Sequence, residues 1–346
     1  MSQLYEQEVR EQPQVLTRLL ERGRERAEDA AAAIRAHQPQ FVMIAARGTS
    51  DNAARYGQYL FGIENKLAVA LSAPSLFTHY GVSPALGHAL VVAISQSGQS
   101  PDVVAVVSEG RRQGAVTVAI TNDAASPLAQ AADFVLPLEA GEEKAVAATK
   151  TYTAQLMALA MLSAAMQGHL ARWQELAAIP ERVSQALGAY PASAVDAAWF
   201  RERTRLVVVG RGYNLCTVFE VALKIKETSY VMADPYSTAD FFHGPMALLN
   251  EGVPVLVIAP NSRFTDDLDV VVRLARERRS PLVVISDSTT RLPGADVTLP
   301  LPSDIPEWLS PMVAVVPGQL WAQAVANARG LSSDAPRGLS KVTLTR

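Results

Sequence analysis

Three serines surround one glycine in the segment Ser95-Gln-Ser-Gly-Gln-Ser100, which directly follows the apolar run Ala89–Ile94. Valines recur at helical spacing after Pro101, and proline suits the first turn of a helix. The unpaired N–H groups and the positive dipole end of such a turn attract an anion, most naturally a phosphate. The segment has no lysine or arginine, so neutral donors would hold the phosphate. A serine-rich turn can also be only a helix cap, and this segment alone leaves both interpretations open.

A second hydroxyl-rich turn, Gly48-Thr49-Ser50, follows the apolar run Phe41–Ala46. In open parallel sheets, ligands bind beyond the carboxyl ends of the strands, where both turns would lie. Two such turns at one sheet edge favour an anion site more strongly than either turn alone. Neither turn has the Gly-x-Gly-x-x-Gly pattern of a dinucleotide site or the Gly-Lys-Ser/Thr of a Walker motif, which disfavours NAD and ATP.

Candidate acid–base residues lie on a helix expected from about Leu215 to Tyr230. Glu220, Lys224 and Glu227 are spaced four and three residues apart, so they share one face of that helix. Such a pattern is most often an exposed ladder of ion pairs. The residues between them are largely apolar, which indicates that this charged face is enclosed instead. A carboxylate beside a lysine in a closed site can act as a base in proton transfer.

Two further features could carry function. His243 follows two phenylalanines and precedes Gly244-Pro245, a pair that would fix the imidazole in a tight turn. A histidine in this setting is more often a core residue than a functional one. The C-terminal segment Asp334–Thr343 combines a Pro-Arg-Gly turn with spaced Leu and Val residues. That pattern indicates a docked tail rather than a disordered one.

The elements that must position these residues alternate between strand and helix. Near-continuous apolar strands separated by helices predict parallel sheets covered on both faces, and the pattern occurs twice along the chain. The serine cluster has no hydroxyl-rich counterpart in the second half, so the anion site is expected in the first. Strands are expected at 41–46, 68–71, 89–94, 115–121 and 134–138, and then at 206–209, 253–259, 282–286 and 297–301.

Composition excludes several classes of protein. With 346 residues, 49% of them hydrophobic and 19% charged, the chain can form two ordinary globular domains. The net charge of −3 disfavours a nucleic-acid or anionic-membrane surface, and no apolar run is long enough to span a bilayer. One cysteine, Cys216, and the lack of a secretory signal predict a cytoplasmic protein. The sequence contains no cluster of His and Cys residues that would indicate a metal site, and we expect no cofactor.

Seven short motifs follow one another along the chain: Glu11-Gln-Pro13, Arg47-Gly-Thr-Ser50, Ser95-Gln-Ser-Gly-Gln-Ser100, Ala147-Ala-Thr-Lys150, Ala222-Leu-Lys-Ile-Lys-Glu-Thr-Ser-Tyr230, His243-Gly-Pro-Met-Ala-Leu248 and Asp334-Ala-Pro-Arg-Gly-Leu-Ser-Lys341. With these motifs in this order, the chain resembles the double sugar isomerase (SIS) domain family. It is similar to the isomerase half of glucosamine-6-phosphate synthase and to SIS-type glucosamine-6-phosphate deaminases. The resemblance implies two tandem SIS domains, each a three-layer α/β/α sandwich of flavodoxin-like order.

The expected domain order follows from these motifs. A helical arm for packing or dimerisation (1–38) precedes the first, phosphosugar-binding SIS domain (39–170). A helical connector (171–203) leads to the second SIS domain (204–330). The tail (331–346) is expected to dock on the active site.

The resemblance also implies roles for individual residues. Glu227 resembles the base that moves a proton between C1 and C2 of the sugar, with Lys224 and Glu220 near the hydroxyls. His243 resembles the residue that assists ring opening from the neighbouring subunit of a homodimer. Lys341 matches a lysine that forms an imine with the open-chain ketose. The residues that would surround the sugar phosphate are Gly48, Thr49, Ser50, Ser95, Gln96, Ser97 and Ser100, with Val146 near the sugar.

Two departures from the synthase pattern affect the expected reaction. The chain shows no glutaminase domain, and Ala148 stands where the synthase often has a serine. We therefore expect conversion of glucosamine 6-phosphate to fructose 6-phosphate and ammonia, through ring opening and aldose–ketose isomerisation. The alternatives are a fructosamine-6-phosphate deglycase, a galactosamine-type deaminase, another phosphosugar isomerase, or a sugar-phosphate-binding regulator without catalysis.

Overall fold

The computed structural model describes residues 4–190, 197–287, 292 and 294–341. The first residues of the expected arm (1–3), part of the connector (191–196), part of the second SIS domain (288–291 and 293) and the end of the tail (342–346) lie outside the described residues. The chain forms two units. The N-unit comprises Gln14–Glu143, Lys150–Ala178 and the segment from Ser340 onward. The C-unit comprises the chain up to Pro13, then Lys144–Thr149 and Ile179–Leu339.

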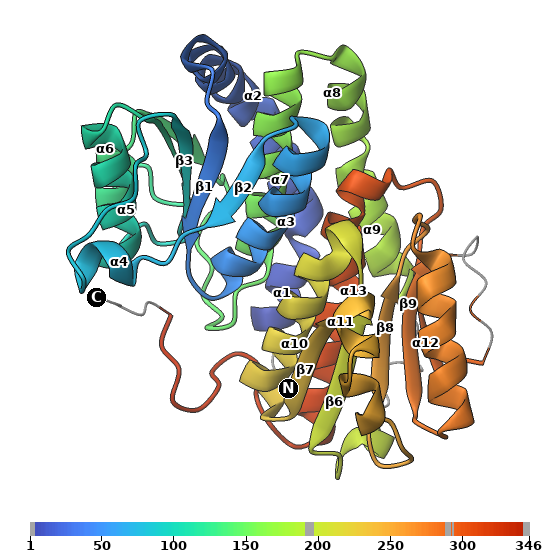
Figure 1. The fold of residues 1–346 in the computed structure, drawn as a ribbon. Helices are drawn as coiled ribbons and strands as arrows, with labels where there is room; N and C mark the ends of the chain where they lie inside the picture. Colours follow the sequence, from blue (N-terminus) through green and yellow to red (C-terminus); the bar gives the residue numbers. More distant parts are fainter. Residues whose placement is uncertain (1–3, 191–196, 288–291, 293, 342–346) are drawn as a thin grey trace. The chain divides into compact units, whose positions relative to one another are not determined.

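The N-unit is built on a five-stranded parallel sheet of order β2-β1-β3-β4-β5 (Figure 1). The strands form where the sequence predicts them: β1, β3 and β4 are apolar runs that are almost entirely buried, whereas the edge strand β2 is partly exposed. Helices α3 and α7 pack together on one face, and α5 contacts the strands from the other. The strands are β1 (Phe41–Ala46), β2 (Ala68–Leu71), β3 (Ala89–Ile94), β4 (Val116–Thr121) and β5 (Phe134–Pro137).

The helices of the N-unit range from a single turn to seven turns. One of them, α6, was not expected from the sequence, and it forms where Ser126 accepts a capping hydrogen bond ahead of a proline. The helices are α2 (Gln12–His37, whose first two residues belong to the C-unit), α3 (Thr49–Glu64), α4 (Ser75–Thr78), α5 (Pro101–Arg112), α6 (Pro127–Ala131), α7 (Lys150–Gln167) and α8 (Leu170–Ala177).

The C-unit repeats this architecture with a parallel sheet of order β10-β9-β8-β6-β7. Its first strand lies between its second and third, as in the N-unit, which confirms the duplication and the fold class. Helices α10 and α13 pack on one face and α12 on the other. The elements are α1 (Leu4–Arg10), α9 (Ile179–Ala189), β6 (Arg205–Gly210), α10 (Leu215–Ser229), β7 (Met232–Ser237), α11 (Thr238–Phe242), β8 (Val255–Ala259), α12 (Thr265–Glu277), β9 (Leu282–Asp287), β10 (Val297–Leu301) and α13 (Ser310–Ala328), with short 3₁₀ turns η2 (Ala198–Phe200), η3 (Gly212–Asn214), η4 (Pro245–Leu248) and η5 (Glu307–Leu309).

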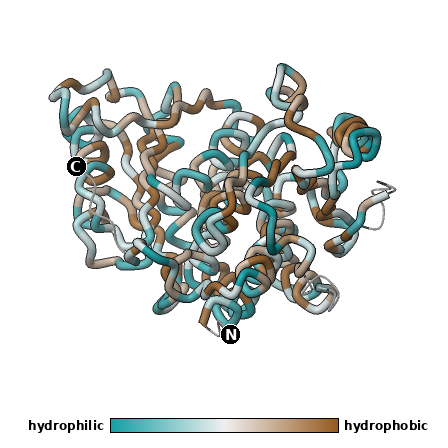
Figure 2. The backbone as a smooth tube through the Cα atoms, turned by 90° about the horizontal axis from the view of Figure 1, so that it is seen from below, coloured by the Kyte–Doolittle hydropathy of each residue, from teal (hydrophilic) through white to brown (hydrophobic). Residues whose placement is uncertain are grey.

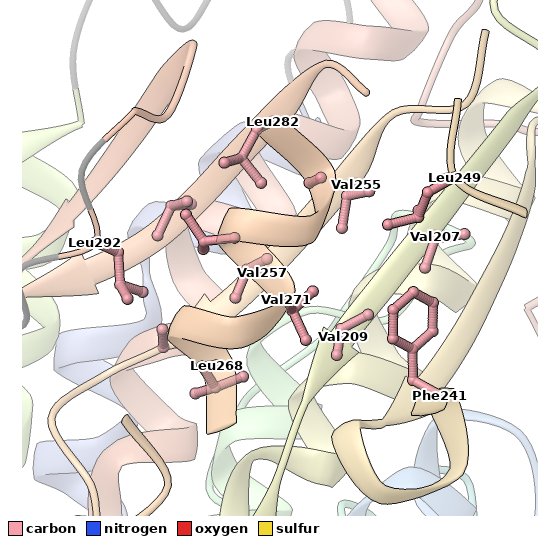
Figure 3. Packing of buried hydrophobic residues seen from close by; sticks show 14 of the residues in the cluster. Val207, Val209, Phe241, Leu249, Val255, Val257, Leu268, Val271, Leu282 and Leu292 are labelled. Carbon is pink, nitrogen blue, oxygen red and sulfur yellow. The ribbon is translucent and has the colours of Figure 1, made fainter. Parts of the chain in front are cut away.

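Aliphatic side chains form the core of each unit. In the C-unit, valines of β6 and β8 pack under α12, and the Phe241 ring closes the cluster near Val209 (Figure 3). When the chain is coloured by hydropathy, the strands appear as hydrophobic runs, whereas several helices alternate between hydrophobic and hydrophilic residues (Figure 2). No helix within the described residues combines the length and apolar character needed to cross a membrane.

The serine-rich turn after β3 depends on Gly98. Its φ is +62°, and its N–H donates to the Ser95 backbone oxygen at 3.2 Å. A Cβ at this position would lie 2.1 Å from Ser126 Oγ, so α6 packs directly against the turn. The turn is therefore fixed both by its own hydrogen bonds and by the neighbouring segment.

We predict that Gly98→Ala lowers the free energy of unfolding by about 2 kcal/mol or more, because left-handed strain and the clash with Ser126 add together. Gly81→Ala is the matched control, since Gly81 has the same φ of +62° and no atom within 4 Å of its Cβ position. Urea denaturation of both variants measures the difference. Equal losses in the two variants would show that Ser126 moves aside at little cost.

Candidate active site

The two hydroxyl-rich turns begin side by side in the N-unit. Strands β1 and β3 are adjacent and parallel, and Ala46 pairs with Ile94 at their carboxyl ends. The chain leaves this edge into α3 from one strand and toward α5 from the other. In a sheet of order 2-1-3-4-5, this is the topological switch point, where such folds bind ligands. The structure thus brings both turns to the edge at which the sequence places them.

Helix capping does not account for the hydroxyls of these turns. Ser100 occupies the N-cap position of α5, but its side chain makes no capping hydrogen bond, and the N-cap of α3 is Gly48. Ser50 is buried, and its hydroxyl accepts a hydrogen bond from Gln155 Nε2 on α7 at 2.9 Å. The Ser95 hydroxyl accepts from the Gly98 N–H at 3.1 Å. The turns are therefore ordered structures that present two helix N-termini, as an anion site requires.

Charge near these turns is already compensated. Arg47 Nε donates to Asp102 Oδ2 at 2.7 Å, and the Asp102 side chain is fully buried in the first turn of α5. Asp102 Oδ1 also accepts from the Val103 N–H at 2.9 Å. The ion pair therefore ties the first turn to α5 while cancelling the charge of the arginine. This leaves the neutral donors of the turns as the candidate phosphate ligands.

The acid–base residues of α10 lie in the C-unit and are enclosed. The side chains of Glu220 and Lys224 are fully buried, and that of Glu227 is 22% exposed. Lys224 Nζ lies 2.6 Å from Glu227 Oε2 and 3.4 Å from Glu220 Oε1. Helix α13 covers α10, which explains why this face is shielded from water. The expectation of an enclosed charged face is confirmed, and the exposed ladder is excluded.

Glu227 has the geometry of a base. Its Oε2 is buried 2.6 Å from Lys224 Nζ, whereas 22% of the side chain remains exposed. Lys224 lies between two carboxylates, so its charge is shared. A partly exposed carboxylate that is held next to a buried cation is able to accept a proton from a ligand.

His243 is held on a short ordered segment after β7. Ser237 caps α11 by accepting from the Asp240 N–H at 3.1 Å, and the His243 N–H donates to the Asp240 carbonyl oxygen at 3.1 Å. Phe241 is fully buried and anchors the segment in the core, whereas the His243 side chain is exposed. The commoner interpretation, a buried core histidine, is therefore wrong for His243.

Both ends of the chain contact the segment around Val146 in the C-unit. The Val146 N–H donates to the Asp334 carbonyl oxygen at 3.2 Å, and Asp334 Oδ1 accepts from the Tyr5 N–H at 2.8 Å. The buried carboxylate of Glu8 accepts from the N–H groups of Lys144 and Ala145. The expected packing arm thus also anchors the segment that carries Val146.

The tail is attached at two further points. In the C-unit, the Arg337 guanidinium stacks 4.1 Å from the centre of the Tyr230 ring, and the Arg337 N–H donates to the Tyr230 hydroxyl at 2.7 Å. In the N-unit, Lys341 Nζ lies 2.7 Å from Glu143 Oε2. Glu143 was not singled out from the sequence, where it reads as part of the charged run Glu142-Glu-Lys144.

No metal centre is evident in the part of the chain that is described, since no three His, Cys, Asp or Glu side chains are grouped to hold an ion.

The model of the SIS domain family matches residues 37–165 and 200–322. The chain belongs to the SIS domain family. The two matched regions contain the two sheets, which confirms the tandem arrangement.

Relatives of this SIS protein include sugar-phosphate enzymes. The glutamine–fructose-6-phosphate aminotransferase (isomerizing) of Thermococcus kodakarensis is 34% identical over 96% of this chain, which spans 56% of that enzyme's length. A structure from Silicibacter pomeroyi DSS-3, assigned as a phosphosugar isomerase, is 33% identical, with a TM-score of 0.88 over 96% of this chain and 100% of that one. Glucosamine-6-phosphate deaminase of Thermotoga maritima shares the fold, with 20% identity and a TM-score of 0.78 over 99% and 100% of the two chains.

We predict that Lys224→Met lowers the free energy of unfolding of this SIS protein by about 3 kcal/mol or more, because it removes a buried ammonium that pairs with the fully buried carboxylate of Glu220. Lys226→Met is the matched control on the exposed side of the same helix and should change stability by less than about 0.5 kcal/mol. Denaturant unfolding compares the two variants. Similar small losses would mean that Glu220 is neutral in the folded protein.

Proposed function

We propose that this SIS protein is an amino-sugar phosphate isomerase and deaminase that converts glucosamine 6-phosphate to fructose 6-phosphate and ammonia. The observation that carries the proposal is the carboxylate of Glu227, which is partly exposed (22%) and is held 2.6 Å from the fully buried ammonium of Lys224. The isomerizing aminotransferase from Thermococcus kodakarensis, at 34% identity, supports a fructose-phosphate substrate.

The sugar phosphate is bound by the two turns of the N-unit. Two helix N-termini and several hydroxyls converge there, and the nearby arginine charge is compensated by Asp102. A phosphate held far from the reacting carbons supplies binding energy that positions C1 and C2. The proposed ligands are Gly48, Thr49, Ser50, Ser95, Gln96, Ser97 and Ser100, with Val146 near the sugar.

The chemistry assigned to α10 is proton transfer. After ring opening, assisted by His243, Glu227 takes the proton from C2 of the amino aldose and returns it to C1. The product is a C2 imine, and water then converts the C=NH group to a ketone and ammonia. Lys224 and Glu220 fix the charge around the base, and Lys341 forms an imine with the open-chain ketose. One positioned base contributes roughly a hundred- to ten-thousand-fold in rate.

An assay of ammonia release tests this function. The panel comprises glucosamine 6-phosphate, galactosamine 6-phosphate and fructosamine 6-phosphates that carry amino acids. We expect ammonia and fructose 6-phosphate from glucosamine 6-phosphate. In calorimetry, the Glu227→Gln variant should bind the sugar phosphate with unchanged affinity. Its turnover should fall by about a hundredfold or more, because the glutamine side chain has the shape of glutamate but cannot act as a base. Glu277→Gln, on the exposed end of α12, is the control for the substitution itself.

Other results of the same panel assign other functions. Release of an amino acid from a fructosamine 6-phosphate identifies a deglycase, and interconversion of sugars without ammonia identifies a plain isomerase. Binding without turnover of any compound identifies a regulator. Undiminished turnover in Glu227→Gln would remove this residue from the mechanism.

We further propose that the enzyme is a homodimer in which His243 serves the site of the neighbouring subunit. The His243 side chain is exposed on its own chain, on a segment anchored by Phe241. An exposed residue on a fixed segment is suited to complete a site in a symmetric dimer.

Mixing two inactive variants tests this arrangement. In a mixed dimer of Glu227→Gln and His243→Asn, one of the two sites keeps both residues when His243 acts across the interface. Random exchange at equal amounts then restores about a quarter of wild-type activity. Each variant alone, taken through the same exchange, is the control. No recovery in a mixture shown to contain mixed dimers would contradict a role across the interface.

A further inference from the structure

Both carboxylate oxygens of Glu143 accept hydrogen bonds within the N-unit. Its side chain is fully buried in the N-unit and lies at the start of α7. Oε1 accepts from the Thr151 N–H at 3.1 Å, and Oε2 accepts from the Thr151 hydroxyl at 2.8 Å. Two donors from one residue, together with the positive end of an 18-residue helix, fix both oxygens and favour a negative charge there.

The carboxylate of Glu143 also contacts the proposed imine-forming lysine. Lys341 Nζ lies 2.7 Å from Glu143 Oε2, and the lysine side chain is 25% exposed. Lysine has a long, flexible side chain, and here it belongs to a C-terminal tail. A buried, rigidly held anion is therefore what gives the amine a defined location within the N-unit.

We propose that Glu143 is the positioning residue for Lys341: it holds the amine where it can attack the carbonyl of the open-chain sugar. The inference rests on the proposed role of Lys341 in the reaction and goes beyond it, because it identifies the group on which that role depends. Glu143 acts through Lys341 and does not itself touch the sugar.

The step that Glu143 supports balances without any further reactant. The Lys341 side chain is 25% exposed, so its ammonium first gives up one proton to solvent. The neutral amine attacks C2 of the open-chain ketose, a C–N bond forms, and the carbonyl oxygen leaves as water once the C=N bond is made. Hydrolysis reverses these bonds, and the amine takes a proton back from solvent.

The surroundings of Glu143 argue against a role as an ordinary surface anchor. Glu139, in the same loop, also pairs with a cation, Arg22, but that arginine is 65% exposed. An exposed pair of this kind contributes little. The Glu143 side chain instead has no exposed surface, and two of its donors belong to Thr151 in the first turn of α7 rather than to the tail. This is the arrangement expected of an anion that fixes the position of a flexible lysine side chain.

Trapping of the imine tests the proposal in the full-length protein. Fructose 6-phosphate supplies the ketose that forms the imine, and cyanoborohydride reduces this imine to a stable amine. Peptide mass spectrometry then identifies the labelled lysine. We expect Lys341 to be labelled in the wild type.

Glu143→Gln should lower the labelling rate and kcat together by about a hundredfold, with KM little changed, because misplacement of a reacting group costs about this factor. Thr151→Val, which removes one donor to Oε2, should have a smaller effect in the same direction. Glu139→Gln is the matched control and should label like the wild type.

Two measurements separate positioning from loss of structure. Calorimetry with glucitol 6-phosphate, which has the phosphate but no carbonyl, should give the same affinity for Glu143→Gln and the wild type. In a Lys341→Met background, Glu143→Gln should cause no further loss of kcat, because its effect passes through the lysine. Loss of glucitol 6-phosphate binding, or additive losses in the double variant, would overturn the proposal.

The same set distinguishes failure of the inference from failure of the proposed function. Full turnover in Lys341→Met would remove both the role of the lysine and that of Glu143. Loss of turnover in Lys341→Met with normal labelling and kcat in Glu143→Gln would overturn only the positioning role.

Discussion

A charged side chain that leaves water must be paired or hydrogen-bonded, because its lost hydration is otherwise too costly. In this protein that constraint governs the residues proposed for function. Asp102 is buried against Arg47 beside the turns proposed to bind phosphate, and Lys224 is buried between two glutamates on α10. Glu143 is buried against Lys341 and two donors of Thr151. Each of these pairings fixes a side chain that a surface position would leave to several rotamers.

The two sheets share one strand order, yet they differ at their switch points. In the N-unit the turns after β1 and β3 carry hydroxyls and begin α3 and α5. In the C-unit, side chains from the segment after β8 pack against the turn after β6. A Cβ at Gly212 would lie 2.5 Å from the Phe264 ring, and Arg211 stacks on that ring and pairs with Asp267. The proposed anion site therefore lies in one copy of the duplicated fold, because the other copy fills the equivalent edge with protein groups.

Apolar periodicity predicts every strand of the N-unit sheet and all but one in the C-unit. The exception, β7, contains Pro235 and exposes Met232, so its pattern does not resemble a buried strand. It forms at the sheet edge, where a proline is tolerated. The turns and α10 could also be predicted, since hydroxyls after apolar runs and charges spaced for one helix face are local patterns. His243 could not be placed by such patterns, because its exposure depends on the α11 segment that follows β7.

Glu8 and Glu143 show where local patterns stop being informative. Glu8 contacts backbone groups 136 and 137 residues away, and Glu143 contacts Lys341 across 198 residues. Nothing in the neighbourhood of either glutamate in the sequence distinguishes it from a solvated surface residue. Contacts that close such long loops are entropically costly, so they form only once the sheets that hold their partners exist. The segment around Val146 therefore takes its position only when both ends of the chain have folded. Glu8 and Asp334 accept hydrogen bonds from its backbone, and Tyr5 in turn donates to Asp334.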